Sequence, residues 1–185
     1  MKLLLHACCG PCASYSVEAL REAGHEPYGY FYNPNIHPYQ EYQRRLESFE
    51  KLAEQMNLPM LQPGGYDFTD WLRQTVYREE IRCRFCYQIR LEQAARIAKH
   101  GKFDAFTTTL LISPFQQHDL IRQVGEAVGE QYGIPFYYQD FRPGFRRSVQ
   151  LSRDFGLYRQ QYCGCIYSEV ERYAPRQKAK GAGSR

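Results

Sequence analysis

The residues of this 185-residue sequence best suited to chemistry are its seven cysteines, which fall into three short groups. The first group lies in the stretch HACCGPC near the N-terminus, the second in CRFC and the third in CGC. Cysteine thiolates bind zinc and iron-sulfur clusters, and pairs of thiols exchange electrons by forming disulfides. An odd number of cysteines argues against a complete set of structural disulfides. We therefore interpret the three groups as metal ligands or redox groups.

The first two groups together offer four sulfurs to one centre. Cys83 and Cys86 have the C-x-x-C spacing, which lets both sulfurs reach one metal or cluster. Cys8 and Cys9 are adjacent, and adjacent residues of a regular strand point to opposite faces, so the two can converge only in a turn. The Gly-Pro pair that follows favours such a turn and the start of a helix, where the helix dipole favours thiolate over thiol.

Cys163 and Cys165 form the third group, and the glycine between them gives the backbone freedom to direct both sulfurs to one place. The pair could be a redox-active dithiol that forms a disulfide bond, or it could hold a second metal. Four thiolates satisfy a structural zinc ion, which would leave this pair without a role. An iron-sulfur centre therefore accounts for the full number of cysteines better than zinc does.

Alternating strands and helices must position these groups. We predict strands at residues 2–6, 27–33, 58–62, 103–111 and 134–141, with helices at about 13–24, 37–57, 67–76, 79–100 and 114–133. This order predicts a three-layer, Rossmann-like α/β fold, with a mostly parallel sheet and helices on both faces. Such sheets bind ligands at the carboxyl ends of their strands, where the first cysteine group lies. Residues 1–174 are expected to form a single domain, and the basic tail 175–185 to stay disordered because it lacks apolar residues.

Composition argues against a membrane-spanning protein, because no window approaches the roughly 20 apolar residues that a span needs. The apolar run from Leu3 to Leu5 is interrupted by His6 and is shorter than the roughly 7 to 15 apolar residues of a secretory signal. We expect a cytoplasmic protein with no membrane partner. The net charge of +4 permits an anionic partner without requiring one.

The sequence closely resembles the epoxyqueuosine reductase family QueH over most of its length. Five stretches carry the resemblance: HACCGPC, FYNPNIHPYQEYQRR, IRCRFCYQIRLEQAA, FTTTLLISPFQQ and RRSVQLSRDFGLYRQQYCGC. The resemblance implies a cytoplasmic oxidoreductase of queuosine biosynthesis, which removes the epoxide oxygen of epoxyqueuosine at the wobble position of tRNA to give queuosine. It also implies a 4Fe-4S cluster, an adjacent mononuclear iron, an external electron donor and no cobalamin.

The resemblance further assigns roles to the cysteines. It implies cluster ligation by four of them, Cys8, Cys9, Cys83 and Cys86. It implies that Cys163 and Cys165 act as a redox-active dithiol or as ligands near the second iron, and both roles stay open. Cys12 is near enough to ligate a metal, but we do not assign it to the cluster.

Proton donors for the reaction must lie at the ligand-binding edge of the sheet. His118 and Asp119 follow the fourth predicted strand, and Asp140 ends the fifth. Tyr32, at the end of the second strand, is a further candidate. We predict catalytic roles for His118 and Asp119 beside the CGC pair.

Arginine side chains bind RNA phosphates, and this sequence offers two adjacent pairs near strand ends. Arg44 and Arg45 follow the second predicted strand, and Arg146 and Arg147 follow the fifth. The sequence is also rich in aromatic residues, with 16 tyrosines and 11 phenylalanines, and exposed ones could stack on an unpaired anticodon base. We therefore expect both arginine pairs to contact tRNA.

Two other classes of protein remain as alternatives. One is an ATP-dependent enzyme of similar architecture that activates tRNA for sulfur transfer, but the first loop reads HACCGPC and lacks a phosphate-binding glycine-serine motif. The other is a non-catalytic, zinc-bound RNA-binding module. Metal content separates it from the enzyme at once, because a zinc protein is colourless and an iron-sulfur protein is brown.

Overall fold

A parallel three-stranded sheet forms the centre of the protein, in a computed structural model that describes residues 1–175. Strand β1 (Lys2–Ala7) lies between β2 (Glu26–Phe31) and β3 (Ala105–Thr108). In register, Leu4 faces Tyr28 on one side and Phe106 on the other. The three leucines of β1 are fully buried, as expected for a parallel strand covered by helices on both faces.

Two of the five predicted strands are reduced to single bridges. Residues 58–62 contribute only the parallel bridge between Met60 and Gly29, and residues 134–141 only the bridge between Phe136 and Phe106. A proline precedes each bridging residue, and proline has no N–H to extend a ladder, which confines these segments to the sheet edges. The prediction of five regular strands is therefore wrong, although both segments lie in their expected places.

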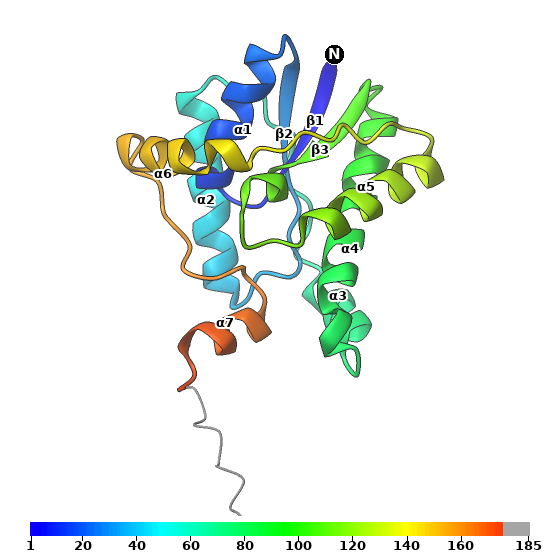
Figure 1. Ribbon diagram of the computed structural model, residues 1–185, viewed down its shortest axis with the longest axis vertical. Helices are drawn as coiled ribbons and strands as arrows, with labels where there is room; N and C mark the ends of the chain where they lie inside the picture. The colour runs from blue at the N-terminus through cyan, green and yellow to red at the C-terminus, as the bar shows by residue number, and fades with distance from the viewer. Residues whose placement is uncertain (176–185) are drawn as a thin grey trace, which may run out of the picture.

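Helices cover both faces of the sheet, which confirms the three-layer α/β prediction (Figure 1). One face carries α1 (Gly10–Glu22), α2 (Tyr39–Gln55) and α6 (Phe145–Asp154). The other carries α4 (Arg82–His100) and α5 (His118–Tyr132), with α3 (Phe68–Thr75) packed on α4. The carboxyl ends of the strands point toward α7 (Ile166–Tyr173), as Figure 1 shows.

Short 3₁₀ helices join several of these elements: η1 (Glu79–Ile81), η2 (Thr109–Ile112) and η3 (Arg142–Gly144). Helix α5 begins later than predicted, because residues 113–117 form a turn in which the Phe115 and Gln116 amides donate to Ser113. This turn follows β3 and η2 and so lies near the carboxyl edge of the sheet. Beyond residue 175, the predicted basic tail lies outside the described residues. Within residues 1–175, no helix is both long enough and apolar enough to cross a membrane.

Candidate metal and redox site

The first cysteine group occupies the turn between β1 and α1, as the sequence predicted. Cys9 is the N-cap of α1, and its Sγ accepts a hydrogen bond from the Cys12 amide at 3.4 Å. Gly10 starts the helix against α2, where a Cβ atom would lie only 2.4 Å from the carbonyl oxygen of Ser48. Glycine is therefore required for this close approach of the cysteine turn to α2.

Three sulfurs converge in this turn. The Sγ atoms of Cys8 and Cys9 are 3.8 Å apart, and those of Cys8, Cys9 and Cys12 all lie within 4.8 Å of one another. All three residues are buried. Three sulfurs this close can ligate one metal ion, so Cys12 lies near enough to ligate a metal, as the sequence predicted, although we did not assign it to the cluster. The signal available was the helical spacing of Cys8, Cys9 and Cys12 across one turn.

The three thiols differ in acidity. The Cys12 and Cys9 thiols donate hydrogen bonds to Cys8 and hold its pKa well below the usual range despite burial. The Thr109 hydroxyl donates a further bond to Cys8 Sγ at 3.3 Å, which also lowers this pKa. Burial raises the pKa of Cys9, and the hydrogen bonds to Cys8 and Cys9 raise that of Cys12. Cys8 is therefore the sulfur that becomes a thiolate first, which is the form that binds metals.

The other cysteine groups are neighbours of each other. Cys83 is half-buried and Cys86 buried in the first turns of α4, and burial raises the pKa of both thiols. Gln116 links α4 to the CGC pair, because it accepts a hydrogen bond from the Tyr87 hydroxyl and donates one to Cys163 Sγ. In residues 1–175, Cys83 and Cys86 do not join Cys8 and Cys9 within 4.8 Å. All seven cysteines are free thiols.

A cavity of about 430 Å³ connects the first and third groups, since Cys8, Cys12 and Cys163 all line it. Its volume is in the range of small-molecule sites. Amide side chains reach its sulfurs: Gln116 Nε2 donates to Cys163 Sγ at 3.1 Å, and Gln160 Nε2 to Cys12 Sγ at 3.5 Å. These glutamines were missed in the sequence, where they stand in the polar pairs of SPFQQ and YRQQY.

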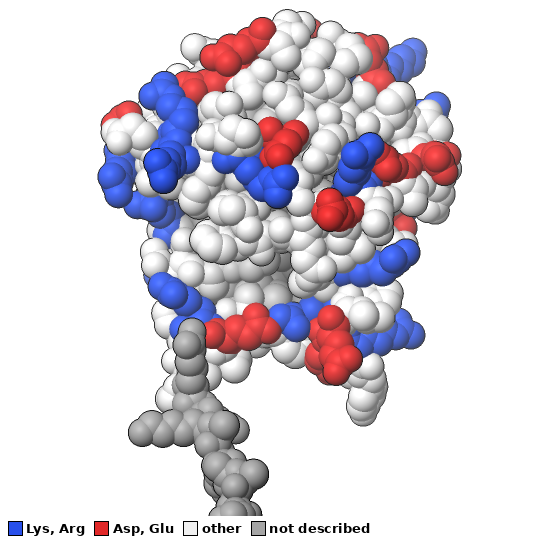
Figure 2. Space-filling view, in the orientation of Figure 1, with Lys and Arg blue, Asp and Glu red and all other residues white. Residues whose placement is uncertain are grey.

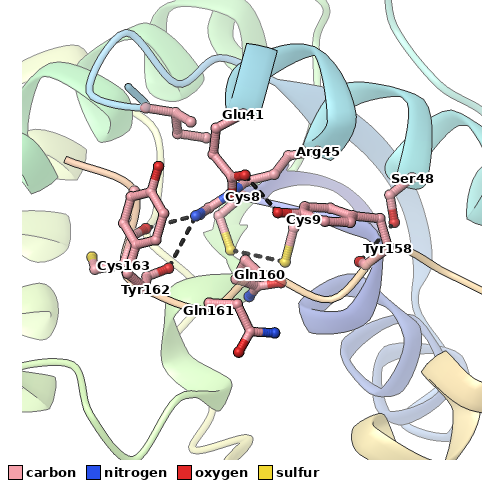
Figure 3. A network of polar contacts seen from close by, with 12 residues as sticks. Cys8, Cys9, Glu41, Arg45, Ser48, Tyr158, Gln160, Gln161, Tyr162 and Cys163 are labelled. Carbon is pink, nitrogen blue, oxygen red and sulfur yellow. Dashed lines mark hydrogen bonds and ion pairs between the residues drawn. The ribbon is translucent and has the colours of Figure 1, made fainter. Parts of the chain in front are cut away.

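A buried ion pair fixes the CGC loop to α2 (Figure 3). Arg45, only 1% exposed, donates through Nε to Glu41 at 2.7 Å and through its two terminal nitrogens to the carbonyls of Tyr162 and Cys163 at 3.0 and 2.9 Å. The Tyr158 hydroxyl donates to the other Glu41 oxygen at 2.6 Å. Arg45 is thus buried with three of its five N–H groups bonded inside the protein, and this geometry does not support the predicted contact of Arg45 with RNA.

The predicted proton donors do not reach the cavity. His118 is buried at the start of α5, where its Nε2 bonds the Leu111 carbonyl at 2.8 Å and its Nδ1 the Tyr138 hydroxyl at 3.4 Å. Asp119 is exposed in the first turn of the same helix. Neither residue lines the cavity. The catalytic roles of His118 and Asp119 therefore stay predictions that the positions of these two side chains do not support.

The remaining arginines lie on the surface. Arg44 on α2 and Arg146 on α6 are exposed, while Arg147 forms an ion pair with Glu18 at 3.0 Å. Figure 2 shows basic side chains gathered on the α6 side of the molecule, and mixed charges elsewhere on this face. Within residues 1–175, Arg44 and Arg146 are thus the predicted surface arginines without an ion pair, although the Arg44 guanidinium lies over the Tyr158 ring, 5.9 Å from its centroid.

The parallel sheet with helices on both faces defines a Rossmann-like α/β protein, and the cysteines and the cavity at its strand ends form a candidate metal or redox site. Residues 3–171 match the family model described as "Epoxyqueuosine reductase QueH", and the chain therefore belongs to this family of oxidoreductases.

Curated relatives support this membership. The chain is 39% identical over 172 residues to the epoxyqueuosine reductase QueH of Dehalococcoides mccartyi, covering 93% of this chain and 94% of that protein. It is 34% identical to that of Thermotoga maritima, covering 92% and 91%. A predicted subunit of tRNA methyltransferase from Methanocaldococcus jannaschii shares the fold, with a TM-score of 0.56 and 12% identity over 83% of this chain and 74% of that one.

Proposed function

We propose that this chain reduces epoxyqueuosine in tRNA to queuosine, using a 4Fe-4S cluster held by its cysteines. The observation that carries the proposal is the convergence of two cysteine groups on one cavity at the carboxyl edge of the sheet, in a member of this family. Removing the epoxide oxygen breaks two carbon-oxygen bonds and forms an alkene. The step consumes two electrons and two protons and releases water, so an external donor must supply the electrons.

The side chains fit an iron-sulfur centre. Seven free cysteines provide soft sulfur donors, and Cys8 has an acidic thiol, as ligation requires. We assign the cluster to four of them, Cys8, Cys9, Cys83 and Cys86. When bound, the cluster supplies electrons one at a time. Cys163 and Cys165 would deliver electrons as a dithiol or hold the adjacent iron.

Aromatic and amide side chains that line the cavity can bind a modified base. Phe115 is 85% exposed and lines the cavity, where its ring can stack on a base taken out of the anticodon loop. Gln116, Gln160 and Gln161 line it too, and their amides can bind the hydroxyl groups of the substrate. The exposed Cys163 thiol lies at the same cavity.

Turnover is the direct test. Protein reconstituted anaerobically with iron and sulfide is mixed with a strong reductant and tRNA that carries epoxyqueuosine. We expect queuosine to replace epoxyqueuosine in the digested nucleosides, measured by mass spectrometry, and expect no conversion by the iron-free protein. Epoxyqueuosine that persists beside a fully loaded, reducible cluster would contradict the proposed function.

RNA binding makes a second prediction. Each of the substitutions Arg44→Gln and Arg146→Gln should weaken tRNA binding and reduce the slope of log affinity against log salt by about one unit, because one phosphate contact is lost. Iron content should not change. Lys102→Gln is the matched control, since Lys102 is exposed just before β3, at the opposite edge of the sheet. If both arginine variants keep the slope of the control, tRNA binds elsewhere on the surface.

A further inference from the structure

Arg90 is a buried cation without a carboxylate partner. Its side chain is 1% exposed on α4, and none of the ion pairs in residues 1–175 includes it. Its Nε donates to the Cys86 carbonyl at 2.8 Å and its Nη2 to the Cys86 sulfur at 3.1 Å. The Tyr87 ring lies 5.8 Å from the guanidinium carbon. The other fully buried arginine, Arg45, differs because Glu41 neutralises it.

A buried charge is strongly unfavourable unless an opposite charge compensates it. The ionisable side chains in contact with Arg90 are those of Cys86, whose Sγ accepts the Nη2 hydrogen bond at 3.1 Å, and Tyr87, whose hydroxyl donates to Gln116 and so keeps its proton. Neutral thiols would leave the guanidinium uncompensated in the protein interior. The arrangement is therefore complementary to a centre whose negative charge resides on cysteine sulfur.

We infer that Arg90 is a positioning residue that tunes the reduction potential of the iron-sulfur cluster, through its N–H bond to Cys86 Sγ and its buried positive charge. The inference rests on the proposed function, which places the cluster at Cys86. Reduction adds one electron to the cluster, and Arg90 neither gains nor loses a proton in that step. Hydrogen bonds to cluster sulfurs and nearby positive charge both stabilise the more negative, reduced form. Arg90 therefore raises the midpoint potential, which eases electron transfer from the donor.

Three substitutions separate the two contributions of Arg90. Arg90→Met removes the charge and the donor, Arg90→Gln keeps an N–H donor without the charge, and Arg90→Lys keeps the charge. We expect Arg90→Met to lower the equilibrium constant for cluster reduction at least tenfold, a fall in potential of about 59 mV for a one-electron couple. The midpoint potential of Arg90→Gln should lie between those of Arg90→Met and wild type, and the potential of Arg90→Lys should be nearest to that of wild type.

The measurement is a redox titration followed by electron paramagnetic resonance, with iron and sulfide per chain determined for each sample. Arg96→Met is the matched control, because Arg96 is exposed on the same helix and contacts Tyr132 instead of a cysteine. Its potential should equal that of wild type. Tuning by Arg90 is overturned if Arg90→Met has the potential of the Arg96→Met control.

Other outcomes are equally decisive. If Arg90→Met binds no iron, the comparison moves to Arg90→Gln and Arg90→Lys, whose equal potentials would overturn the inference. Loss of the cluster from all three variants would also overturn it, by showing that Arg90 only supports the fold of the site. A wild-type chain that assembles no reducible cluster would instead contradict the proposed function itself. The two failures are thus distinguished by the wild-type sample.

Discussion

Serine at any of the four proposed cluster ligands, Cys8, Cys9, Cys83 or Cys86, is expected to lower iron and sulfide per chain and to abolish epoxide reduction. A serine hydroxyl is a harder and far less acidic ligand than a thiol, so it does not replace a thiolate in an iron-sulfur centre. The effect should be largest at Cys8, whose pKa is lowered by its neighbours and whose thiolate is thus the one most readily available to iron.

Substitutions at the CGC loop should behave differently. Cys163 is exposed at the cavity and is held through backbone carbonyls. Cys163→Ser and Cys165→Ser are therefore expected to stop turnover while most of the visible absorbance of the cluster remains. Cys12→Ser should be the mildest change of the seven, because Cys12 is outside the four proposed ligands and a serine hydroxyl can still donate the hydrogen bond to Cys8.

Iron and sulfide content, together with the resonance signal of the reduced cluster, distinguishes these groups. If Cys163→Ser loses the cluster while Cys8→Ser keeps it, the proposed division of roles is wrong. If Cys12→Ser loses as much iron as Cys8→Ser while Cys83→Ser loses none, the ligands are the three sulfurs that already lie within 4.8 Å of one another.

The sequence predicted the part of this site that is local in the chain. The turn containing Cys8 and Cys9 follows from an apolar strand and a Gly-Pro helix start, and both features act within a few residues. The prediction of regular outer strands was wrong for an equally local reason, because the prolines at positions 59 and 135 remove an N–H at each sheet edge.

The side chains that the sequence misplaced depend on distant segments. Arg44 and Arg45 look like a pair of exposed charges, yet the loop at residues 158–163 helps to bury Arg45, while Arg44 stays exposed with its guanidinium over the Tyr158 ring. The spacing of four from Glu41 to Arg45 indicates an ion pair on one helix face, but it does not reveal burial. Arg90 stands four residues after Cys86 in the same way, but the sequence alone does not predict that its guanidinium donates to the Cys86 sulfur.

Substitution of Arg45 by methionine is expected to lower the free energy of unfolding by about 3 to 5 kcal/mol, the usual cost of removing one partner from a buried ion pair. Glu41 would remain buried without its cation, and the carbonyls of Tyr162 and Cys163 would lose their donors. The CGC loop should then be displaced from the cavity. Turnover is expected to fall, while the sulfide content and visible absorbance of the cluster should persist because none of the proposed cluster ligands lies on this loop.

Denaturant unfolding of iron-free Arg45→Met, compared with that of iron-free Arg44→Met, isolates the contribution of the buried ion pair to stability. Arg44 is the exposed neighbour on α2, and its loss should change stability by no more than about 0.5 kcal/mol. The double variant Glu41→Gln with Arg45→Met should recover part of the loss, because no unpaired charge stays buried. If Arg45→Met unfolds at the same denaturant concentration as Arg44→Met, the ion pair does not hold the loop, and the position of Cys163 must depend on other contacts such as the hydrogen bond from Gln116.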